Sequence, residues 1–167
     1  MIFPVLILAF VTLQRLGELV LARRNTARLL GRGGQEAGAG HYPLIMLLHA
    51  TWLAGLWLLA LDQAPNLFWL AIFVVLQLLR VWVIATLGER WTTRIIVLPE
   101  APLVAAGPYR FVSHPNYCVV VAEILVLPLV FGLVWYGVAF SVLNGLVLWL
   151  RIRTEGAALR ANVRVAA

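Results

Sequence analysis

Lysine is absent from this chain of 167 residues, and all 13 of its basic residues are arginine. Cysteine occurs once, as Cys118, which excludes an intrachain disulfide and a metal site built from cysteines. Charged residues make up only 12% of the chain, whereas 63% are hydrophobic. Soluble domains carry about 25% charged residues, so this composition predicts an integral membrane protein.

Four apolar runs approach or exceed the roughly 20 helical residues that cross a bilayer. They cover residues 2–21, 44–61, 67–87 and 118–150. The last run is too long for one span without a large tilt, and Pro128, Gly132 and Gly137 interrupt it, so we divide it near 132–136 into a tight hairpin of two short helices. We therefore predict an all-α integral membrane protein with five transmembrane helices in a single domain, residues 1–167.

Arginine is confined to one side of the predicted helices. Eleven of the 13 arginines follow the first or fifth helix or lie between the third and fourth, while the opposite side offers Asp62 and no basic residue. The positive-inside rule places the arginine side in the cytoplasm, with the N-terminus outside and the C-terminus inside. This placement beside membrane helices indicates contact with membrane lipid and argues against nucleic acid as a partner.

The few charges inside the apolar runs are Arg15, Glu18, Arg80 and Glu123. Charges at membrane depth are costly, so these side chains should face the bundle interior, a polar cavity or one another. We expect a structural ion pair between Arg15 and Glu18, which are three residues apart. Glu123 should either pair with Arg80 or accept hydrogen bonds within the bundle. His49, in the second predicted helix, is interpreted as a hydrogen-bonded packing residue.

Two loops lie on the arginine side. The first, 23–43, is expected to begin ordered and continue as a flexible Gly-rich link over 31–40. The second, 88–117, has no long apolar run, and Pro108 and Pro115 restrict its backbone. From the residues alone two interpretations stay open. The loop either presents donors, rings and an imidazole to a small ligand, or lies at the membrane interface with Tyr and Trp as anchors.

The order of three motifs carries a resemblance to a known family. "LGERWTTRI" covers residues 87–95, "GPYRFVSHPNY" covers 107–117, and "RIRTEGAAL" follows the predicted hairpin at 151–159. This order resembles the isoprenylcysteine carboxyl methyltransferase family, whose members carry GPYR, then RHPxY, then an arginine and a Glu-Glu pair followed by leucine. The resemblance spans most of the chain, from Arg23 to Leu159. It departs from the family at Ser113, at Gly156 and in the tail "RANVRVAA", which lacks the usual aromatic residues.

The resemblance implies a cofactor loop at the cytoplasmic face, between the third and fourth helices, that binds S-adenosyl-L-methionine. It implies that Arg151 and Glu155 are catalytic, orienting an acceptor oxygen or a cofactor carboxylate and shielding the sulfonium charge. From spacing alone, these two residues share a helix face and can form a direct ion pair. The implied cofactor-binding residues are Gly107, Pro108, Tyr109, Arg110, His114, Pro115, Asn116 and Tyr117.

The function expected from the resemblance is an S-adenosylmethionine-dependent O-methyltransferase of a bacterial inner membrane. Its partner would be a lipophilic small molecule or a prenylated acceptor. A prenylcysteine-like carboxylate needs no base, whereas a hydroxyl needs deprotonation, for which Glu155 or His114 are candidates. Residues 23–49 are similar to bacterial relatives that include methyltransferases of polyketide pyrones, so an alkylpyrone acceptor is the alternative. A small transporter or a membrane scaffold with a pathway of buried charges is the alternative from another class.

Overall fold

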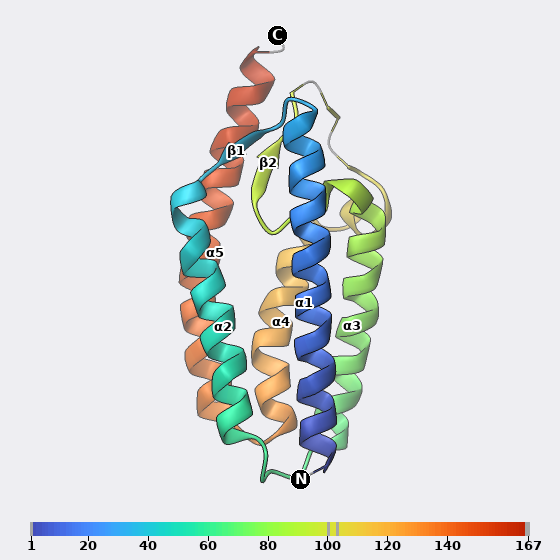
Figure 1. Cartoon of the computed structure of the whole chain (residues 1–167), viewed down its shortest axis with the longest axis vertical. Coiled ribbons are helices and arrows are strands. Elements are labelled where there is room, and N and C mark those ends of the chain that lie inside the picture. The colour runs from blue at the N-terminus through green and yellow to red at the C-terminus, as the bar shows by residue number, and fades with distance from the viewer. Residues whose placement is uncertain (1, 100, 103, 166–167) are drawn as a thin grey trace.

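The structure is a computed structural model that describes residues 2–99, 101–102 and 104–165, with side chains up to residue 158. Within these ranges, helices run lengthwise in an elongated bundle, and a short β ribbon lies at the end where the C-terminus emerges (Figure 1). The elements are α1 (Ile2–Gly31), β1 (Gln35–Ala37), η1 (Ala39–His41), α2 (Tyr42–Leu59), α3 (Leu67–Leu87), η2 (Gly88–Arg90), β2 (Ile95–Val97), η3 (Gly107–Arg110), α4 (Pro115–Val130) and α5 (Val134–Val165).

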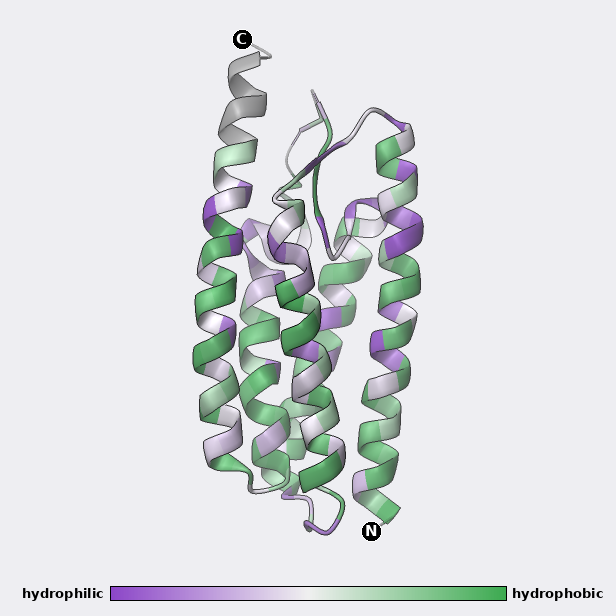
Figure 2. Ribbon diagram, turned by 60° about the vertical axis from the view of Figure 1, so that its left-hand side comes forward, coloured by the Kyte–Doolittle hydropathy of each residue, from purple (hydrophilic) through white to green (hydrophobic). Residues whose placement is uncertain are grey.

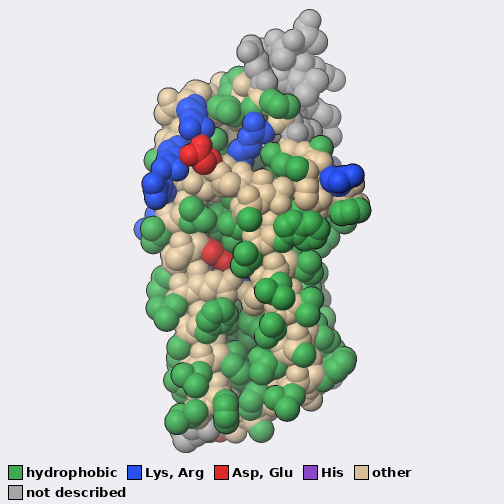
Figure 3. All heavy atoms as spheres, turned by 90° about the vertical axis from the view of Figure 1, so that its right-hand side faces the viewer, with side chains coloured by type: hydrophobic (Ala, Val, Ile, Leu, Met, Phe, Trp, Pro, Cys, Tyr) green, Lys and Arg blue, Asp and Glu red, His purple; other side chains and the backbone are tan. Residues whose placement is uncertain are grey.

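The outside of the bundle is largely apolar, as a bilayer requires. Four of the described helices, α1, α2, α3 and α5, are long and apolar enough to cross a membrane, while α4 is shorter at 16 residues. Hydrophobic residues colour the bundle away from the ribbon, and polar residues gather toward the ribbon (Figure 2). The face in Figure 3 shows hydrophobic side chains over its lower part and arginines near the ribbon end. The chain is therefore an all-α integral membrane protein.

The predicted hairpin is present between α4 and α5. Gly132 has a φ of 70°, the left-handed conformation that ends helices, and its amide donates to the Leu129 carbonyl at 3.1 Å. The prediction of two short helices is wrong for α5, which continues over 32 residues to Val165. No residue after Leu150 is a helix breaker except Gly156, and one glycine costs only about 1 kcal/mol. Arg151 and Glu155 therefore lie on the extension of a membrane helix.

The prediction of a flexible link over 31–40 is also wrong. Residues 35–37 pair with 95–97 as an antiparallel ribbon, with Glu36 opposite Ile96, and Arg94 donates to the Glu36 carboxylate at 2.9 Å. The end of α1 is held nearby, because the Asn25 side-chain amide donates to the Trp91 carbonyl at 2.8 Å. Three-residue strands of this kind depend on a partner about 60 positions away, so local sequence signals do not identify them.

Helix α4 lies between α3 and α5 and packs against both. Its buried side chains include Ile124 and Leu127, and the Trp52 indole of α2 donates to the Ile124 carbonyl at 3.2 Å. On the other side, the hydroxyl of Tyr136 in α5 donates to the Trp52 carbonyl at 2.8 Å. Bonds from aromatic side chains thus connect α2 to both helices of the hairpin.

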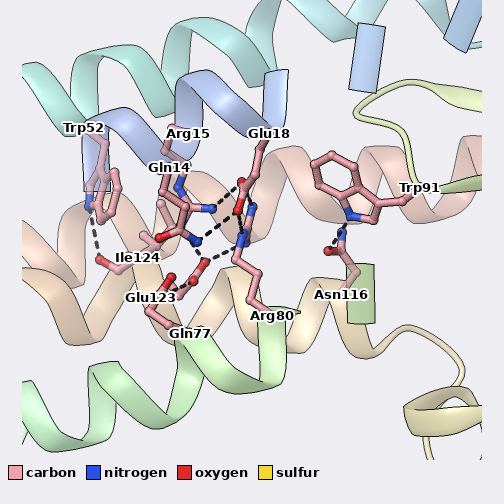
Figure 4. A network of polar contacts seen from close by, with 10 residues as sticks. All are labelled: Gln14, Arg15, Glu18, Trp52, Gln77, Arg80, Trp91, Asn116, Glu123 and Ile124. Atoms are coloured by element: carbon pink, nitrogen blue, oxygen red, sulfur yellow. Dashed lines mark hydrogen bonds and ion pairs between the residues drawn. The ribbon is translucent and has the colours of Figure 1, made fainter. Parts of the chain in front are cut away.

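A buried ionic network joins α1 to α3 and α4 at mid-length (Figure 4). Arg80 donates to Glu18 at 2.6 Å and to Glu123 at 2.8 Å, and Arg15 donates to Glu18 at 2.9 Å and to Glu123 at 2.8 Å. Gln77 donates to the other Glu123 oxygen at 2.8 Å. The predicted ion pair of Arg15 with Glu18 is confirmed, and Glu123 both pairs with Arg80 and accepts a hydrogen bond. Two arginines balance two glutamates, so the network carries no net charge.

Glu123→Ala should destabilise the protein severely, because Arg15 and Arg80 would then share one carboxylate in a buried site. Removing one partner of a buried ion pair costs about 3–5 kcal/mol. The measurement is the thermal unfolding midpoint of the detergent-solubilised protein.

The matched control is Arg32→Ala, which breaks the exposed ion pair between Arg32 and Glu89, 3.0 Å long. Exposed pairs contribute up to about 1 kcal/mol, so its midpoint should stay near that of the parent protein. If the two variants unfold at the same midpoint, the ionic network is not the contact that holds α1 against the other helices.

Candidate functional site

A cavity of about 290 Å³ lies inside the bundle and is lined by residues of all five described helices and of the segment 91–93. Most of its polar lining residues fall into two levels. The upper tier, toward the ribbon, consists of Thr93, Asn116, Tyr117 and Arg151. The lower tier, deeper in the bundle, consists of Arg15, Glu18, His49, Arg80, Glu123 and Asn144. Apolar side chains such as Leu16, Leu53 and Val120 fill most of the remaining wall.

Tyr117 is at the centre of the upper tier. Its hydroxyl donates to the Glu155 carboxylate at 2.5 Å and accepts from Nε of Arg151 at 2.9 Å. Arg151 also donates through Nη1 to the Thr93 carbonyl at 2.8 Å. Because the guanidinium is planar, these two bonds to Tyr117 and Thr93 fix the orientation of the whole group. The bond to Thr93 fastens α5 to the segment that follows η2.

The direct ion pair that the spacing allows between Arg151 and Glu155 is not formed; among the described side chains, the Tyr117 hydroxyl connects the two residues. The helical spacing is as predicted, but α4 inserts an aromatic ring between the two side chains. The half-buried phenol both donates and accepts, so it bonds to both charged groups at once. Arg151 consequently makes no ion pair with any described carboxylate, and its Nη2 group has no hydrogen bond to a described residue.

The GPYR motif forms η3, a single 3₁₀ turn beside the end of α3. Gly107 has a φ of 54°, and a Cβ there would lie 2.5 Å from Oγ1 of Thr86. Pro108 is buried, whereas Arg110 is exposed and is not among the residues that line the cavity. Burial, with a smaller effect from the Glu155 carboxylate, raises the pKa of Tyr109 to about 12, so its phenol stays protonated at neutral pH.

The HPNY motif begins α4. Pro115 occupies the first turn, where a missing N–H is tolerated, and the His114 ring stacks on Tyr117 with centroids 5.2 Å apart. Of the ten predicted site residues, Asn116, Tyr117 and Arg151 line the cavity, and Glu155 is bonded to Tyr117. The other six lie in η3 and at the start of α4 and are not among the residues that line the cavity. Their roles in binding stay a prediction.

Among the lining residues that sequence analysis did not predict are Thr93 and Asn144. Thr93 contributes a backbone carbonyl, and no sequence signal identifies such a contact. Asn144 is 4% exposed, and its side-chain nitrogen has no hydrogen-bond partner among the described residues. A signal for Asn144 was present, because it is a polar residue inside the 118–150 run, seven positions before Arg151 and therefore on nearly the same helix face.

Comparisons with known proteins identify the family of the chain. The model of the isoprenylcysteine carboxyl methyltransferase family matches residues 69–161, which include every predicted site residue. The protein YpbQ of Bacillus subtilis is 37% identical over 160 residues, covering 93% of this chain and 95% of YpbQ. A protein of Haemophilus influenzae is 24% identical over 165 residues, covering 95% of this chain and 96% of its own. Both relatives are described as uncharacterized. No solved structure matches the chain.

Gly107→Ala should displace η3, because an alanine would adopt a positive φ and press its Cβ against Thr86. Backbone strain of this kind costs about 1–3 kcal/mol, so binding of S-adenosylhomocysteine, measured by calorimetry, should weaken about tenfold or more.

Gly145→Ala is the control, since that glycine lies within α5 and a Cβ there meets nothing within 4 Å. Its affinity should equal that of the parent protein. If Gly107→Ala binds as tightly as Gly145→Ala, η3 plays no part in shaping the site.

Proposed function

Since the chain belongs to the isoprenylcysteine carboxyl methyltransferase family, we propose that it is an S-adenosylmethionine-dependent O-methyltransferase acting on a lipophilic acceptor within the membrane. The observation that supports this most is the cavity, which extends from the predicted cofactor residues of the upper tier to polar groups at membrane depth. A water-soluble methyl donor and an apolar acceptor have to meet in one site. The polar upper tier near the arginine-rich end suits the methyl donor. The part of the cavity inside the apolar bundle suits the acceptor.

The upper tier fits the chemistry of S-adenosylmethionine. The cofactor carries a carboxylate, an ammonium group, hydroxyls and a purine. Arg151, which has no carboxylate partner among the described residues, suits the carboxylate, and Glu155 suits the ammonium group or a hydroxyl. The Asn116 amide and the Tyr117 ring add a polar contact and a stacking surface on the cavity wall. We propose that these four residues hold the cofactor, supported by Gly107, Pro108, Tyr109, Arg110, His114 and Pro115.

When bound, S-adenosylmethionine supplies an electrophilic methyl group on a positively charged sulfur. The task of the protein is to align an acceptor oxygen with that group and to keep water out. Tyr117 and Thr93 hold Arg151 in one orientation, and Glu155 adds negative charge at the rim of the site. The apolar wall formed by Leu16, Leu53 and Val120 removes the hydration shell of an incoming acceptor. Orientation and desolvation are the two contributions that a methyl transfer of this kind requires.

The orientation in the membrane follows the arginines. The described arginines outside the ionic network lie on the last turns of α1, in the loops beside the ribbon and on the extension of α5, all near one end of the bundle. We propose that this end is cytoplasmic, which also places the upper tier on the side where the cofactor is made. The N-terminus and the Asp62 loop would then face outward.

Fusion reporters test this orientation. Green fluorescent protein fused to the C-terminus should fluoresce, and alkaline phosphatase fused after Asp62 should be active, because the first folds inside and the second works only outside. Exchanging the two reporters should silence both. The reverse pattern would put the upper tier outside and remove the cofactor supply.

Arg151→Lys should lower methyl transfer about tenfold or more, equivalent to about 1.4 kcal/mol of activation free energy. Lysine keeps the charge but cannot bond to Tyr117 and Thr93 from one rigid plane. The parent protein in detergent should bind S-adenosylhomocysteine saturably, and the variant should bind it more weakly.

Arg153→Lys is a matched control on the same helix, since Arg153 is exposed and its guanidinium lies 4.7 Å from the Trp149 ring centroid. It should bind and turn over like the parent protein. Equal losses in both variants would indicate a general effect of the helix extension. Absence of saturable binding by the parent protein would favour a transporter or scaffold.

A further inference from the structure

The segment 35–42, which contains β1 and the first residue of α2, packs against two elements that carry the upper tier. Its strand β1 pairs with β2 and lies across α5 (Figure 1). Gly38 lies so close to α5 that a Cβ there would be 2.6 Å from Cγ2 of Thr154, the neighbour of Glu155. The whole segment precedes residues 69–161, the part of the chain that the family model matches. The upper tier therefore has supporting contacts that lie outside the family motifs.

Tyr42, at the end of this segment, holds two neighbouring residues of the loop after η2. Its hydroxyl lies 3.1 Å from Oγ1 of Thr93, and the guanidinium carbon of Arg94 lies 4.6 Å from the centroid of its ring. A cation at that distance over an aromatic ring is attracted to it. Nη1 of Arg94 also donates to both carboxylate oxygens of Glu36 in β1, each at 2.9 Å. Thr93 and Arg94 are thus restrained by two residues of the segment 35–42.

The peptide bond between Thr93 and Arg94 passes this restraint to Arg151. Its carbonyl, that of Thr93, accepts from Nη1 of Arg151 at 2.8 Å. Nε of the same guanidinium donates to the Tyr117 hydroxyl at 2.9 Å. One bond leaves a planar guanidinium free to turn about it, whereas a second bond fixes the plane. Because the Thr93 carbonyl supplies the second bond, its position decides the orientation of Arg151.

We propose that Tyr42 and Glu36 are positioning residues for Arg151. Neither is among the residues that line the cavity, so each acts through Thr93 or Arg94 rather than on a bound ligand. Tyr42 contacts both of these residues and Glu36 bonds to Arg94 alone, so Tyr42 contributes more. The effect on catalysis rests on the proposed function, because it requires that Arg151 orients the cofactor or the acceptor. The restraint on the guanidinium itself does not depend on that function.

The first test needs no cofactor. Phenylglyoxal modifies arginine side chains, and mass spectrometry of the peptides gives the rate at each position. In the detergent-solubilised parent protein, Arg151 should react slowly because two bonds hold its guanidinium. Tyr42→Phe keeps the ring against Arg94 and removes only the hydroxyl. Loss of one hydrogen bond should raise the rate at Arg151 about threefold or more, while the exposed Arg153 keeps its rate.

Tyr136→Phe is the matched control. It also removes a tyrosine hydroxyl that bonds to α2, at the Trp52 carbonyl 2.8 Å away, but this bond lies toward the opposite end of the bundle. The rate at Arg151 should equal that of the parent protein. An unchanged rate at Arg151 in Tyr42→Phe overturns the proposal. An equal rise at Arg153 also overturns it, because the variant would then have loosened the whole helix extension.

The second test measures methyl transfer in a double-mutant cycle. In the parent background, Tyr42→Phe should lower turnover about threefold to tenfold, as expected for the loss of one hydrogen bond. In the Arg151→Lys background, the same change should have no further effect, because an ammonium group has no plane for the Thr93 carbonyl to fix. A merely structural role would lower turnover by the same factor in both backgrounds, and that result overturns the positioning role.

Glu36→Gln tests the second residue. It removes the charge that pairs with Arg94 and leaves the contacts of Tyr42 in place. The labelling rate at Arg151 should rise by a smaller factor than in Tyr42→Phe. An unchanged rate in this variant removes Glu36 from the proposal.

The outcomes separate this inference from the proposed function. Faster labelling of Arg151 in Tyr42→Phe, with turnover lowered only in the parent background, supports the inference. Faster labelling with unchanged turnover overturns the role of the restraint in catalysis. A parent protein that binds no S-adenosylhomocysteine overturns the proposed function, while the labelling rates still decide whether Tyr42 restrains Arg151.

Discussion

The shared carboxylates of Glu18 and Glu123, each held between Arg15 and Arg80, are the contact on which the rest of the structure depends. Within the described chain, this network connects α1 to α3 and α4 in a part of the bundle where apolar contact distinguishes little between protein and lipid. It also forms part of the cavity wall. The bonds that hold the helices together therefore also set the polarity of the cavity wall.

The second connection is made at the upper tier. Tyr117 of α4 bonds to both Arg151 and Glu155 of α5, and Arg151 bonds to the segment behind the ribbon. The ribbon and the bond from Asn25 to Trp91 fix that segment over the bundle. Residues of the proposed cofactor site that are far apart in the sequence are thus held by one group of contacts. At the upper tier, the proposed reaction depends on aligning the methyl donor with the acceptor more than on acid or base strength. The rigid contacts around Arg151 supply that alignment.

Much of this arrangement was predictable from the sequence. Membrane helices follow from apolar runs, and the ion pairs follow from the cost of leaving Arg15, Glu18, Arg80 and Glu123 unpaired in lipid. The motifs around Tyr117 and Arg151 indicated the site. The β ribbon, the Tyr117 bridge between Arg151 and Glu155, and the Thr93 carbonyl were not predictable, because each depends on segments brought together by packing. The length of α5 was misjudged because the arginines after Leu150 were taken as the end of a helix, whereas arginine is a good helix former.

The central claim is that this cavity transfers a methyl group to the oxygen of a lipophilic acceptor. The most direct measurement incubates membranes containing the protein with S-adenosylmethionine labelled in its methyl group and follows the label into an organic extract. The account predicts a labelled lipid-soluble product that depends on the protein. Label that stays in the aqueous phase, although the protein binds the cofactor, would contradict the claim.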